Sequence, residues 1–485
     1  MKKRFLTLSI LALSSISLLA QNEIDALRYS SDSPLGTARF SAMGGAFGSL
    51  GGEFSALSLN PAGIGMYQYS EFTFTPSFNF NSTSSYFNNK ETDFNSNLKI
   101  GNIGLVFSSQ KNNSDWKRVN IAIGWNQLAN YNNNIKISGE NSTSSLADNI
   151  LSISQGNVID ELNPLYSGPA FWTDLIDLAD NSIDTTTDWY ANDNGNYISH
   201  IKGNSSKTQS KSIHSSGGKN EFVFSVGGSF NEQLYLGATI GIPTLDYYEK
   251  STYNESNFED TINGLHSFDF TEKLSVYGSG INLKLGALLR VSESLKLGAA
   301  VHTPTAYNIE ETYETSITTY FTDNAYKETS PTNLFEYNLI TPWKAILSAS
   351  SVMNKNILLT ADYEVIDYTF SRMSSHSYSF DDENKNIAEL YTKTSNIRLG
   401  AEMNVKPLIL RTGYSKYGSA FANKDFGTEN YSFGIGLNNG GYYFDASYIL
   451  TQRNSEHLLY NENFIDPISL VNTSHNIIIT LGFRY

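Results

Sequence analysis

Cysteine is missing from this chain of 485 residues, which excludes disulfide bonds, thiol catalysis and a lipid anchor on cysteine. Long apolar runs are missing too. None follows residue 20, so we expect no transmembrane helix. Basic residues are few, since 33 Lys and Arg stand against 48 Asp and Glu, for a formal net charge of −15. That balance argues against nucleic-acid binding, which requires a basic surface.

Catalytic motifs are also missing. The seven histidines are scattered, and neither a Gly-x-Ser-x-Gly nor a His-Glu-x-x-His motif occurs. A haem site would need an axial His, Tyr or Met in a suitable pocket, and the histidines do not cluster. We therefore expect no enzyme, no metal site and no cofactor.

The first twenty residues predict a secretory signal peptide. Three basic residues at positions 2–4 are followed by an apolar stretch to about residue 19, and we expect cleavage between Ala20 and Gln21. The alternative is a transmembrane helix. It fits less well because the apolar part is short and contains four serines and a threonine.

Aromatic residues and glycine are abundant, with 30 Tyr, 28 Phe and 36 Gly, and apolar side chains recur at every second position. In the C-terminal segment the apolar parity is Ile477, Ile479, Leu481, Phe483 and Tyr485. Period-2 alternation places these side chains on one face, which suits lipid, while the polar parity suits a lumen. A last strand ending on Phe483 and Tyr485 resembles the assembly signal of outer-membrane barrels. By itself it also fits an edge strand of a soluble sandwich.

Counting such segments predicts fourteen strands, near 68–80, 97–109, 116–128, 219–231, 233–250, 270–291, 294–312, 335–353, 356–370, 388–404, 407–417, 429–438, 441–452 and 473–485. From the second strand onward, short turns alternate with long polar loops. This is the pattern of outer-membrane barrels, in which turns are periplasmic and loops extracellular. We predict an all-β, antiparallel transmembrane β-barrel in the outer membrane of a Gram-negative bacterium. We expect a monomer that contacts membrane lipid and the barrel-assembly machinery.

Two regions lie outside the predicted strands. Residues 129–218 form the longest connection, in which we expect a partly helical extracellular loop with one helix near Phe171–Asp180. Residues 21–67 precede the first strand, and fourteen strands enclose a lumen too wide for side chains alone to fill. The expected organisation is a signal peptide at 1–20, an N-terminal plug at 21–67 and a barrel at 68–485.

The segment 36–67 carries a family resemblance. Its matching positions are Met43, Gly44, Gly45 and Ala46, then Glu53, Ser55 and Ala56, then Asn60, Pro61, Ala62 and Gly63. This order and spacing resemble the N-terminal hatch of the FadL/TodX-like family of long-chain fatty-acid and hydrophobic-compound transporters. Residues 302–305 and 410–414 are similar to two strand segments of that family. The long 129–218 insert departs from its pattern.

The resemblance implies a fourteen-stranded barrel plugged by a hatch. Members take up hydrophobic molecules, hold them in an apolar pocket and release them laterally through a kinked strand wall. It also implies hatch or gating roles for Gly44, Gly45 and the segment Asn60-Pro61-Ala62-Gly63. Tight turns of a compact plug are the favoured role of the glycines over direct ligand contact, and Pro61 bends the chain. Five apolar side chains either line the ligand pocket or attach the plug to the barrel: Phe40, Met43, Phe47, Phe54 and Leu57.

We expect diffusion-driven uptake of small hydrophobic compounds, such as fatty acids or aromatics, gated by the hatch and followed by lateral release. The alternative is a secretion-associated or structural barrel of the same fold that binds exported proteins. A general polar porin is a third possibility. The plug argues against it, because a porin has no use for about 45 residues before its first strand.

Overall fold

The computed structural model describes residues 23–111, 114–179, 195–201, 204–261 and 263–485. The predicted signal peptide lies outside these residues. Within the described ranges, no helix is both long enough and apolar enough to cross a membrane.

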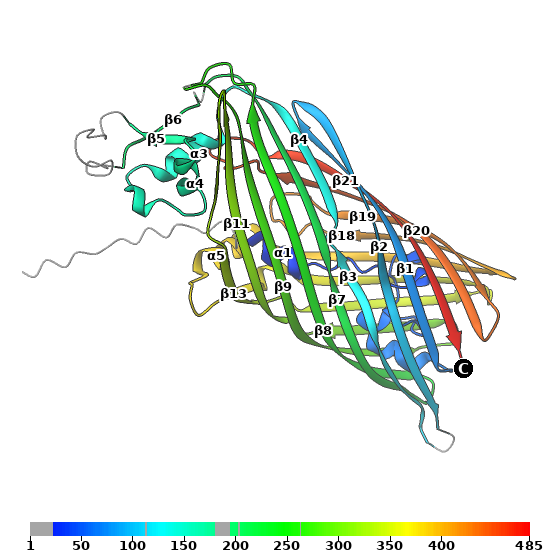
Figure 1. The fold of residues 1–485 in the computed structure, drawn as a ribbon. Helices are drawn as coiled ribbons and strands as arrows, with labels where there is room; N and C mark the ends of the chain where they lie inside the picture. Colours follow the sequence, from blue (N-terminus) through cyan, green and yellow to red (C-terminus); the bar gives the residue numbers. More distant parts are fainter. Residues whose placement is uncertain (1–22, 112–113, 180–194, 202–203, 262) are drawn as a thin grey trace, which may run out of the picture.

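The chain forms a closed antiparallel barrel of fourteen strands (Figure 1). The last strand returns to the first, with Glu71 opposite Arg484 and Tyr86 opposite Ser469. The uninterrupted strands are β1 (Glu71–Phe87), β2 (Asn89–Gln110), β7 (Lys207–Phe230), β8 (Leu234–Ser256), β9 (Leu265–Arg290), β15 (Ile357–Asp367), β17 (Lys393–Val405), β18 (Leu408–Tyr417), β19 (Thr428–Asn438), β20 (Tyr442–His457) and β21 (Ile468–Arg484).

Three positions of the barrel wall are each filled by two strands in succession: β3 (Trp116–Asn130) with β4 (Asn133–Asn141), β10 (Leu295–His302) with β11 (Ala306–Phe321), and β13 (Asn333–Ile340) with β14 (Lys344–Met353). The second and third breaks contain Pro304 and Pro342, which have no N–H to give to a ladder. These breaks lie side by side, because the Thr341 N–H donates to the Thr305 carbonyl at 3.0 Å.

Two-residue alternation decides which side chains face out, as predicted. On β9, Tyr277 is 64% exposed on the outer face, whereas Lys284 is 5% exposed and points into the lumen. The predicted strand positions are matched. The strands on one side of the barrel are much longer than predicted: β7, β8 and β9 have 24, 23 and 26 residues. About ten tilted residues cross the bilayer core, so these strands extend well beyond it.

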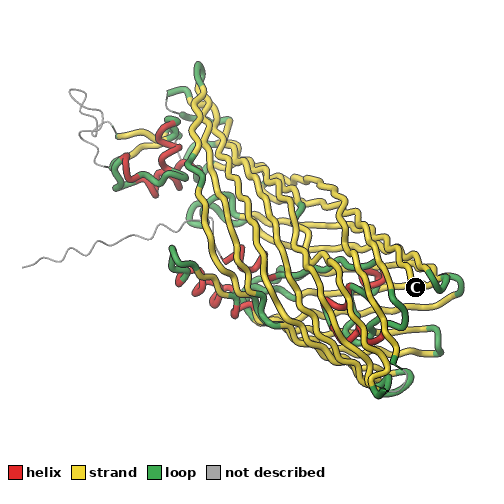
Figure 2. Tube along the Cα trace, turned by 60° about the horizontal axis from the view of Figure 1, so that its bottom comes forward, coloured by secondary structure: helices red, strands yellow, loops and turns green. Residues whose placement is uncertain are grey.

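The segment before β1 lies inside the barrel, as predicted for a hatch (Figures 1 and 2). Thr37 begins one helix by accepting a hydrogen bond from the Phe40 N–H at 3.3 Å. Asn60 accepts one from the Ala62 N–H at 3.1 Å and so begins the last helix, in which proline takes the first position. The elements are α1 (Glu23–Ser30), α2 (Ala38–Ala42) and the 3₁₀ helices η1 (Ser55–Ser58) and η2 (Pro61–Met66).

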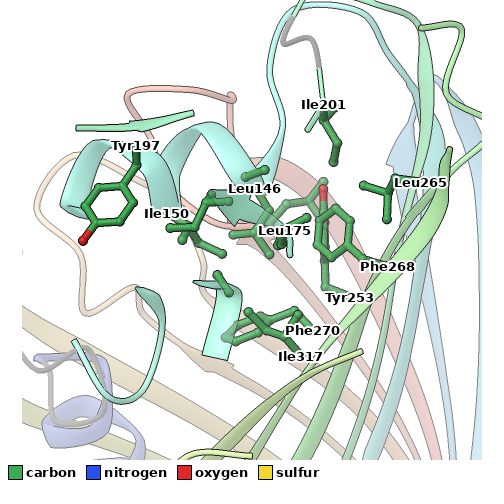
Figure 3. Close-up of a cluster of buried hydrophobic side chains, with 14 of the residues drawn as sticks. Leu146, Ile150, Leu175, Tyr197, Ile201, Tyr253, Leu265, Phe268, Phe270 and Ile317 are labelled. Carbon is green, nitrogen blue, oxygen red and sulfur yellow. The ribbon is translucent and has the colours of Figure 1, made fainter. Parts of the chain in front are cut away.

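The connection between β4 and β7 forms a cap outside the barrel wall, at the end with the long loops. Its elements are α3 (Leu146–Ser154), η3 (Ile159–Glu161), α4 (Ser167–Trp172), β5 (Ile176–Leu178) and β6 (Tyr197–Ser199). Figure 3 shows how its apolar side chains, among them Leu146, Ile150 and Leu175, meet Phe268 and Ile317 of the barrel in one core. The expected helix near 171–180 is wrong in extent. Residues 176–178 form a strand because β6 supplies a pairing partner from about twenty residues away.

Shorter elements complete the end of the barrel with the long loops. They are β12 (Ala325–Thr329), which pairs with β11; β16 (Arg372–Ser374), which pairs with β13; the 3₁₀ helix η5 (Tyr368–Phe370); and α5 (Asp381–Leu390). Helix α5 contacts α1, so a loop between two strands reaches the N-terminal segment. Through this contact, the long loop that contains α5 packs against the first helix of the hatch.

Candidate functional site

Ion pairs attach the hatch to the barrel wall. The Asp32 carboxylate lies 2.6 Å from Lys219 Nζ on β7 and also contacts Lys344 on β14. Burial acts to raise the pKa of Asp32. The two ammonium groups lower that pKa more strongly, so it lies well below its usual range. A carboxylate held by two lysines from two non-adjacent strands fixes the chain that follows α1.

A second set of polar contacts holds residues 37–67, the part of the hatch after α1, which we call the lower hatch. Asp362 on β15 accepts a hydrogen bond from the Gly48 N–H at 3.0 Å. Ser58 donates to Glu221 at 2.9 Å, and Glu221 also takes Lys284 Nζ at 2.6 Å. His302 Nε2 lies 2.8 Å from the Leu59 carbonyl. Buried charged groups need such partners, and here they come from several strands. Polar contacts from several strands therefore attach the lower hatch to the barrel wall.

Glu53 lies within the hatch itself. Its carboxylate accepts a hydrogen bond from the Thr37 hydroxyl at 2.5 Å. Burial raises the pKa of Glu53 to about 7, and the charge of Arg39 opposes this shift. The hatch thus contains a carboxyl group whose charge changes near neutral pH.

A small cavity lies in the lumen between the hatch and the wall. Its volume is about 60 Å³, and it is lined by Tyr29, Phe40, Lys284, His302 and Arg398 together with other polar side chains. Small-molecule sites usually have 300–1,000 Å³. This cavity is therefore too small for a fatty acid while the hatch has this arrangement.

An apolar cluster of wall side chains surrounds α1, the first helix of the hatch. Tyr29 stands edge-on to Tyr131 and Tyr247, at 6.4 Å from each ring, and the Arg28 guanidinium lies 4.4 Å from the Tyr247 ring centroid. Arg28 is paired with Asp25 in the same helix. We call the apolar surroundings of α1 the upper chamber. Its buried apolar wall consists of Leu245, Tyr247, Val276, Tyr307, Ile309, Tyr337, Leu339, Ile366, Tyr368, Met373, Phe380, Ile387 and Tyr391.

The wall beside the upper chamber lacks a regular ladder. The β2–β3 pairing runs from Gln110–Arg118 to Asn102–Asn126 and stops there. Beyond that point, among the described pairings, β2 is bonded only to β1 and β4 only to β7. We call the line between β2 and β3–β4 the seam. Along it, the two neighbouring strand positions share no backbone ladder over most of a strand.

Side chains close the seam in place of a ladder. From the lumen-facing parity of β1, Asn81 donates to the Asn132 carbonyl at 2.6 Å and Ser85 to the Lys136 carbonyl at 2.7 Å. From β2, Asn95 donates to the Asn134 side chain at 3.2 Å. Side-chain hydrogen bonds thus stand where a backbone ladder would otherwise join the two strand positions.

The seam and the upper chamber meet at Tyr131. This residue lies between β3 and β4, where the strand breaks, and its ring packs against Tyr29 of α1 and, at 5.5 Å, Tyr247. The next residue, Asn132, is the acceptor of the first seam hydrogen bond. A shift of α1 would therefore reach the seam through one residue.

The structure places the hatch residues singled out in the sequence as follows. Gly44 and Gly45 have φ of 63° and 74°, which favours glycine. A Cβ on Gly44 would lie 2.9 Å from the Tyr414 carbonyl of the wall. Gly63 lies against Gly51, since its Cβ would come within 2.9 Å of the Gly51 Cα. Asn60 also donates to the Gly48 carbonyl at 2.5 Å, and Ala62 packs on the wall.

The five apolar hatch side chains form two separate groups. Phe40, Met43 and Phe47 pack together and against wall residues on β10 and β14, and Phe40 also lines the small cavity. Phe54 and Leu57 pack with Ile64 and Tyr67 of the hatch and with β2, β3 and β7. All five are buried.

The last two aromatic positions face outward. Phe483 is 50% exposed and Tyr485 is 66% exposed. The Phe483 ring stacks on Phe72 of β1 at 6.5 Å, across the joint where the barrel closes.

Several residues of the site escaped the sequence-based predictions, namely Arg28, Asp32, Tyr131 and the asparagines of the seam. A weak signal existed for α1, because residues 23–30 have acidic residues in the first turn and a basic residue in the last. For Tyr131 there was none, since a strand break without proline leaves no local mark.

Comparisons with known proteins agree with this architecture. No family model and no curated protein matches the chain. The crystal structure of a Pseudomonas aeruginosa FadL homologue matches with a TM-score of 0.57 and 13% identity, over 94% of this chain and 99% of that one. The Pseudomonas putida toluene transporter TodX gives 0.51 and 12%, over 93% and 99%. The CymD monoaromatic hydrocarbon channel gives 0.50 and 11%, over 94% and 100%.

At these identities the likeness establishes the fold. The protein is an outer-membrane β-barrel with an internal N-terminal hatch, and its fold is that of the FadL- and TodX-like channels, as the hatch motif predicted. Two of these proteins are named as a transporter and a channel, and the other as a FadL homologue.

Proposed function

We propose that this protein takes up small hydrophobic compounds, such as fatty acids or aromatics, across the outer membrane by diffusion. The observation that carries the proposal is the position of the upper chamber, the apolar surround of α1, which meets the seam at Tyr131 and lies next to the ion pairs of Asp32. A hydrophobic ligand gains about 25 cal/mol for each Å² of apolar area moved out of water. The ligand gains this free energy in the chamber and in the bilayer. It gains none beside the charged side chains that hold the lower hatch.

In this scheme α1 is the gate. Its eight residues span about 12 Å and occupy the chamber that a ligand would use. The helix is held by apolar contacts, by the stacking of Arg28 on Tyr247, and by hydrogen bonds from Tyr391 to the Glu23 carbonyl and from Lys219 to the Tyr29 carbonyl. An incoming ligand would replace these apolar contacts with its own, so displacement of α1 costs little apolar burial.

The exit is lateral, through the seam. Ligand in the chamber contacts Tyr131, and movement of Tyr131 pulls on the backbone that accepts the Asn81 hydrogen bond. Release into the bilayer avoids the polar contacts at Glu221, Asp362 and His302.

The lower hatch anchors this gate. Gly44 and Gly45 let the hatch turn lie directly against the wall, and the segment Asn60–Gly63 fixes where the chain enters the barrel. The apolar residues Phe40, Met43, Phe47, Phe54 and Leu57 support the hatch and meet the ligand if it penetrates below α1.

A cross-link over the seam tests the proposal, because the native chain has no cysteine. Asn95→Cys with Asn134→Cys places two thiols where two side chains now share a 3.2 Å hydrogen bond. Joining them with a short reducible bis-thiol reagent should slow uptake of oleate and of toluene by cells at least tenfold. Reduction of the cross-link should restore the rate.

The matched control joins Lys416→Cys with Glu429→Cys. These exposed residues face each other on β18 and β19, which already share a ladder, so the cross-link adds no new constraint. Uptake should be unchanged there. Undiminished uptake in the cross-linked seam variant would exclude the seam as the exit, and absence of any saturable uptake by the unmodified protein would exclude transport itself.

A further inference from the structure

The cap contains a cleft that plays no part in the proposed transport route. It lies between α4, β5 and the residue after β6 on one side, and the turn between β11 and β12 on the other. Its volume is about 580 Å³, which is within the usual range for small-molecule sites. The cleft is separate from the upper chamber, since none of its lining residues belongs to the chamber wall.

One buried side chain in this cleft has unused hydrogen-bonding groups. His200 lines the cleft and is 3% exposed, yet neither ring nitrogen has a hydrogen-bond partner among the described residues. The Asp177 carboxylate lies 3.9 Å from Nε2, beyond hydrogen-bond distance. Burying an imidazole without partners costs free energy, so such a group indicates a missing polar partner. A ligand in the cleft would supply it.

The charge of the cleft selects the ligand. Asp174, Asp177 and Asp323 line it, and no Lys or Arg is among its described lining residues. Three carboxylates around one cleft attract a cation and repel an anion, and they act at the surface without needing burial.

Aromatic rings form the remaining walls. Trp172 and Tyr326 are both exposed at the cleft, and Phe321 stands edge-on to the Tyr326 ring at 5.8 Å and to the His200 ring at 6.4 Å. Faces of Trp, Tyr and Phe attract ammonium groups through their electron-rich rings, and they also hold an apolar body. Carboxylates and exposed aromatic rings together suit an organic cation better than a neutral hydrocarbon or an inorganic ion.

We propose that the cap binds a small organic cation in this cleft. The ammonium group lies between Asp174 and Asp177 and donates to the unprotonated nitrogen of His200, while the apolar body packs on Trp172 and Tyr326. The cap is then a recognition module for amines, placed on the barrel beside the long loops and independent of the hydrophobic route through the lumen.

The experiment uses the full-length protein in detergent and two probes of the same shape. We expect 2-phenylethylamine to bind saturably in isothermal titration calorimetry, at least tenfold more tightly than 2-phenylethanol, which has the same ring and chain without the charge. Replacing Asp174 and Asp177 together by Asn should lower the amine affinity at least tenfold. Trp172→Ala should lower it by about three- to tenfold, as expected for loss of one cation–π face.

Asp466→Asn is the matched control, since it removes one exposed carboxylate elsewhere in the loops and should leave the affinity unchanged. Heat-modifiable migration of each variant on a gel reports a folded barrel. Equal affinity for amine and alcohol, no saturable binding of the amine, or wild-type affinity in the double Asn variant would each overturn the proposal. Uptake of oleate should be unaffected in all these variants. The amine-binding proposal can therefore be disproved while the transport proposal holds, and the transport proposal can be disproved while amine binding holds.

Discussion

Arg39 of the hatch and Glu402 of β17 form a two-point ion pair, with Nε 2.8 Å from Oε2 and Nη2 3.1 Å from Oε1. A planar guanidinium bound at two points fixes both the distance and the angle of its partner. Glu402 also takes Arg411 at 2.7 Å, and Arg411 takes Asp445 at 2.6 Å. The hatch is thereby joined to a charge network on β17, β18 and β20.

The first prediction follows from this pair. Arg39→Gln should loosen the hatch without unfolding the barrel, at a cost of about 1–2 kcal/mol, because the pair is partly exposed and Glu402 keeps Arg411. Cells should become moderately sensitive to large hydrophilic antibiotics. Lys424→Gln, which breaks an exposed pair with Glu456 of β20, is the control and should change nothing. Equal sensitivity of the two variants would argue against a docking role for Arg39.

The second prediction concerns the whole plug. Deleting residues 21–57 while keeping Asn60-Pro61-Ala62 should leave a folded barrel with an open polar lumen, because the wall closes without the hatch. Single channels should conduct in planar bilayers, and uptake of hydrophobic compounds should fall because α1 and its chamber contacts are lost. A deletion variant that folds but neither conducts nor alters permeability would show that the segment is not a plug.

The third prediction is a pH dependence. A carboxyl group whose pKa is raised on folding stabilises the folded form most below its ordinary pKa of 4.5, and this contribution is lost as pH rises toward 7. The hatch should therefore be tighter at pH 5 than at pH 8, which leak conductance in planar bilayers would measure. Glu53→Gln keeps an acceptor for Thr37 and should abolish most of that difference. The same pH ratio in variant and wild type would assign the effect to another group.

The fourth prediction concerns assembly. Replacing Phe483 and Tyr485 by Ser removes outward-facing area from the closing strand and the stacking of Phe483 on Phe72. Export should continue, while the heat-modifiable folded form in the outer membrane should be lost or strongly reduced. Replacing the exposed loop aromatic Phe370 by Ser is the control and should leave the yield unchanged. A normal yield of folded double variant would remove the assembly role from these residues.

The fifth prediction concerns topology. A cysteine at Asn423, in the exposed loop between β18 and β19, should react with an impermeant thiol reagent on whole cells. A cysteine at Lys355, in the short turn between β14 and β15, should react only after the outer membrane is permeabilised. The absence of native cysteine makes the background zero. Reversed labelling would place the long loops on the periplasmic side.

Part of the fold could be predicted because it depends on residues that are close together in the sequence. The parity of Tyr277 and Lys284 on β9, and of Ile477 and Phe483 on β21, fixes which face meets lipid, since successive side chains of a strand point to opposite sides. The same regularity gave the strand positions and the alternation of short turns and long loops. The hatch motif around Asn60-Pro61 indicated the fold because its turns depend on residues within a few positions of one another.

Tertiary structure alone decided the rest. Nothing near Tyr131 in the sequence marks the seam, because a ladder ends where its partner strand moves away, and that partner is distant along the chain. The pairing of Ile176–Leu178 with Tyr197–Ser199 likewise turned an expected helix into a strand. The partners of Asp32 and Arg39 lie roughly 190 to 360 residues away, so their charges could be read from the sequence but their contacts could not. Composition and periodicity determined that the chain forms a barrel. The position of the seam and the partners of the hatch charges were decided by the tertiary structure, because only closure of the barrel brings these distant residues together.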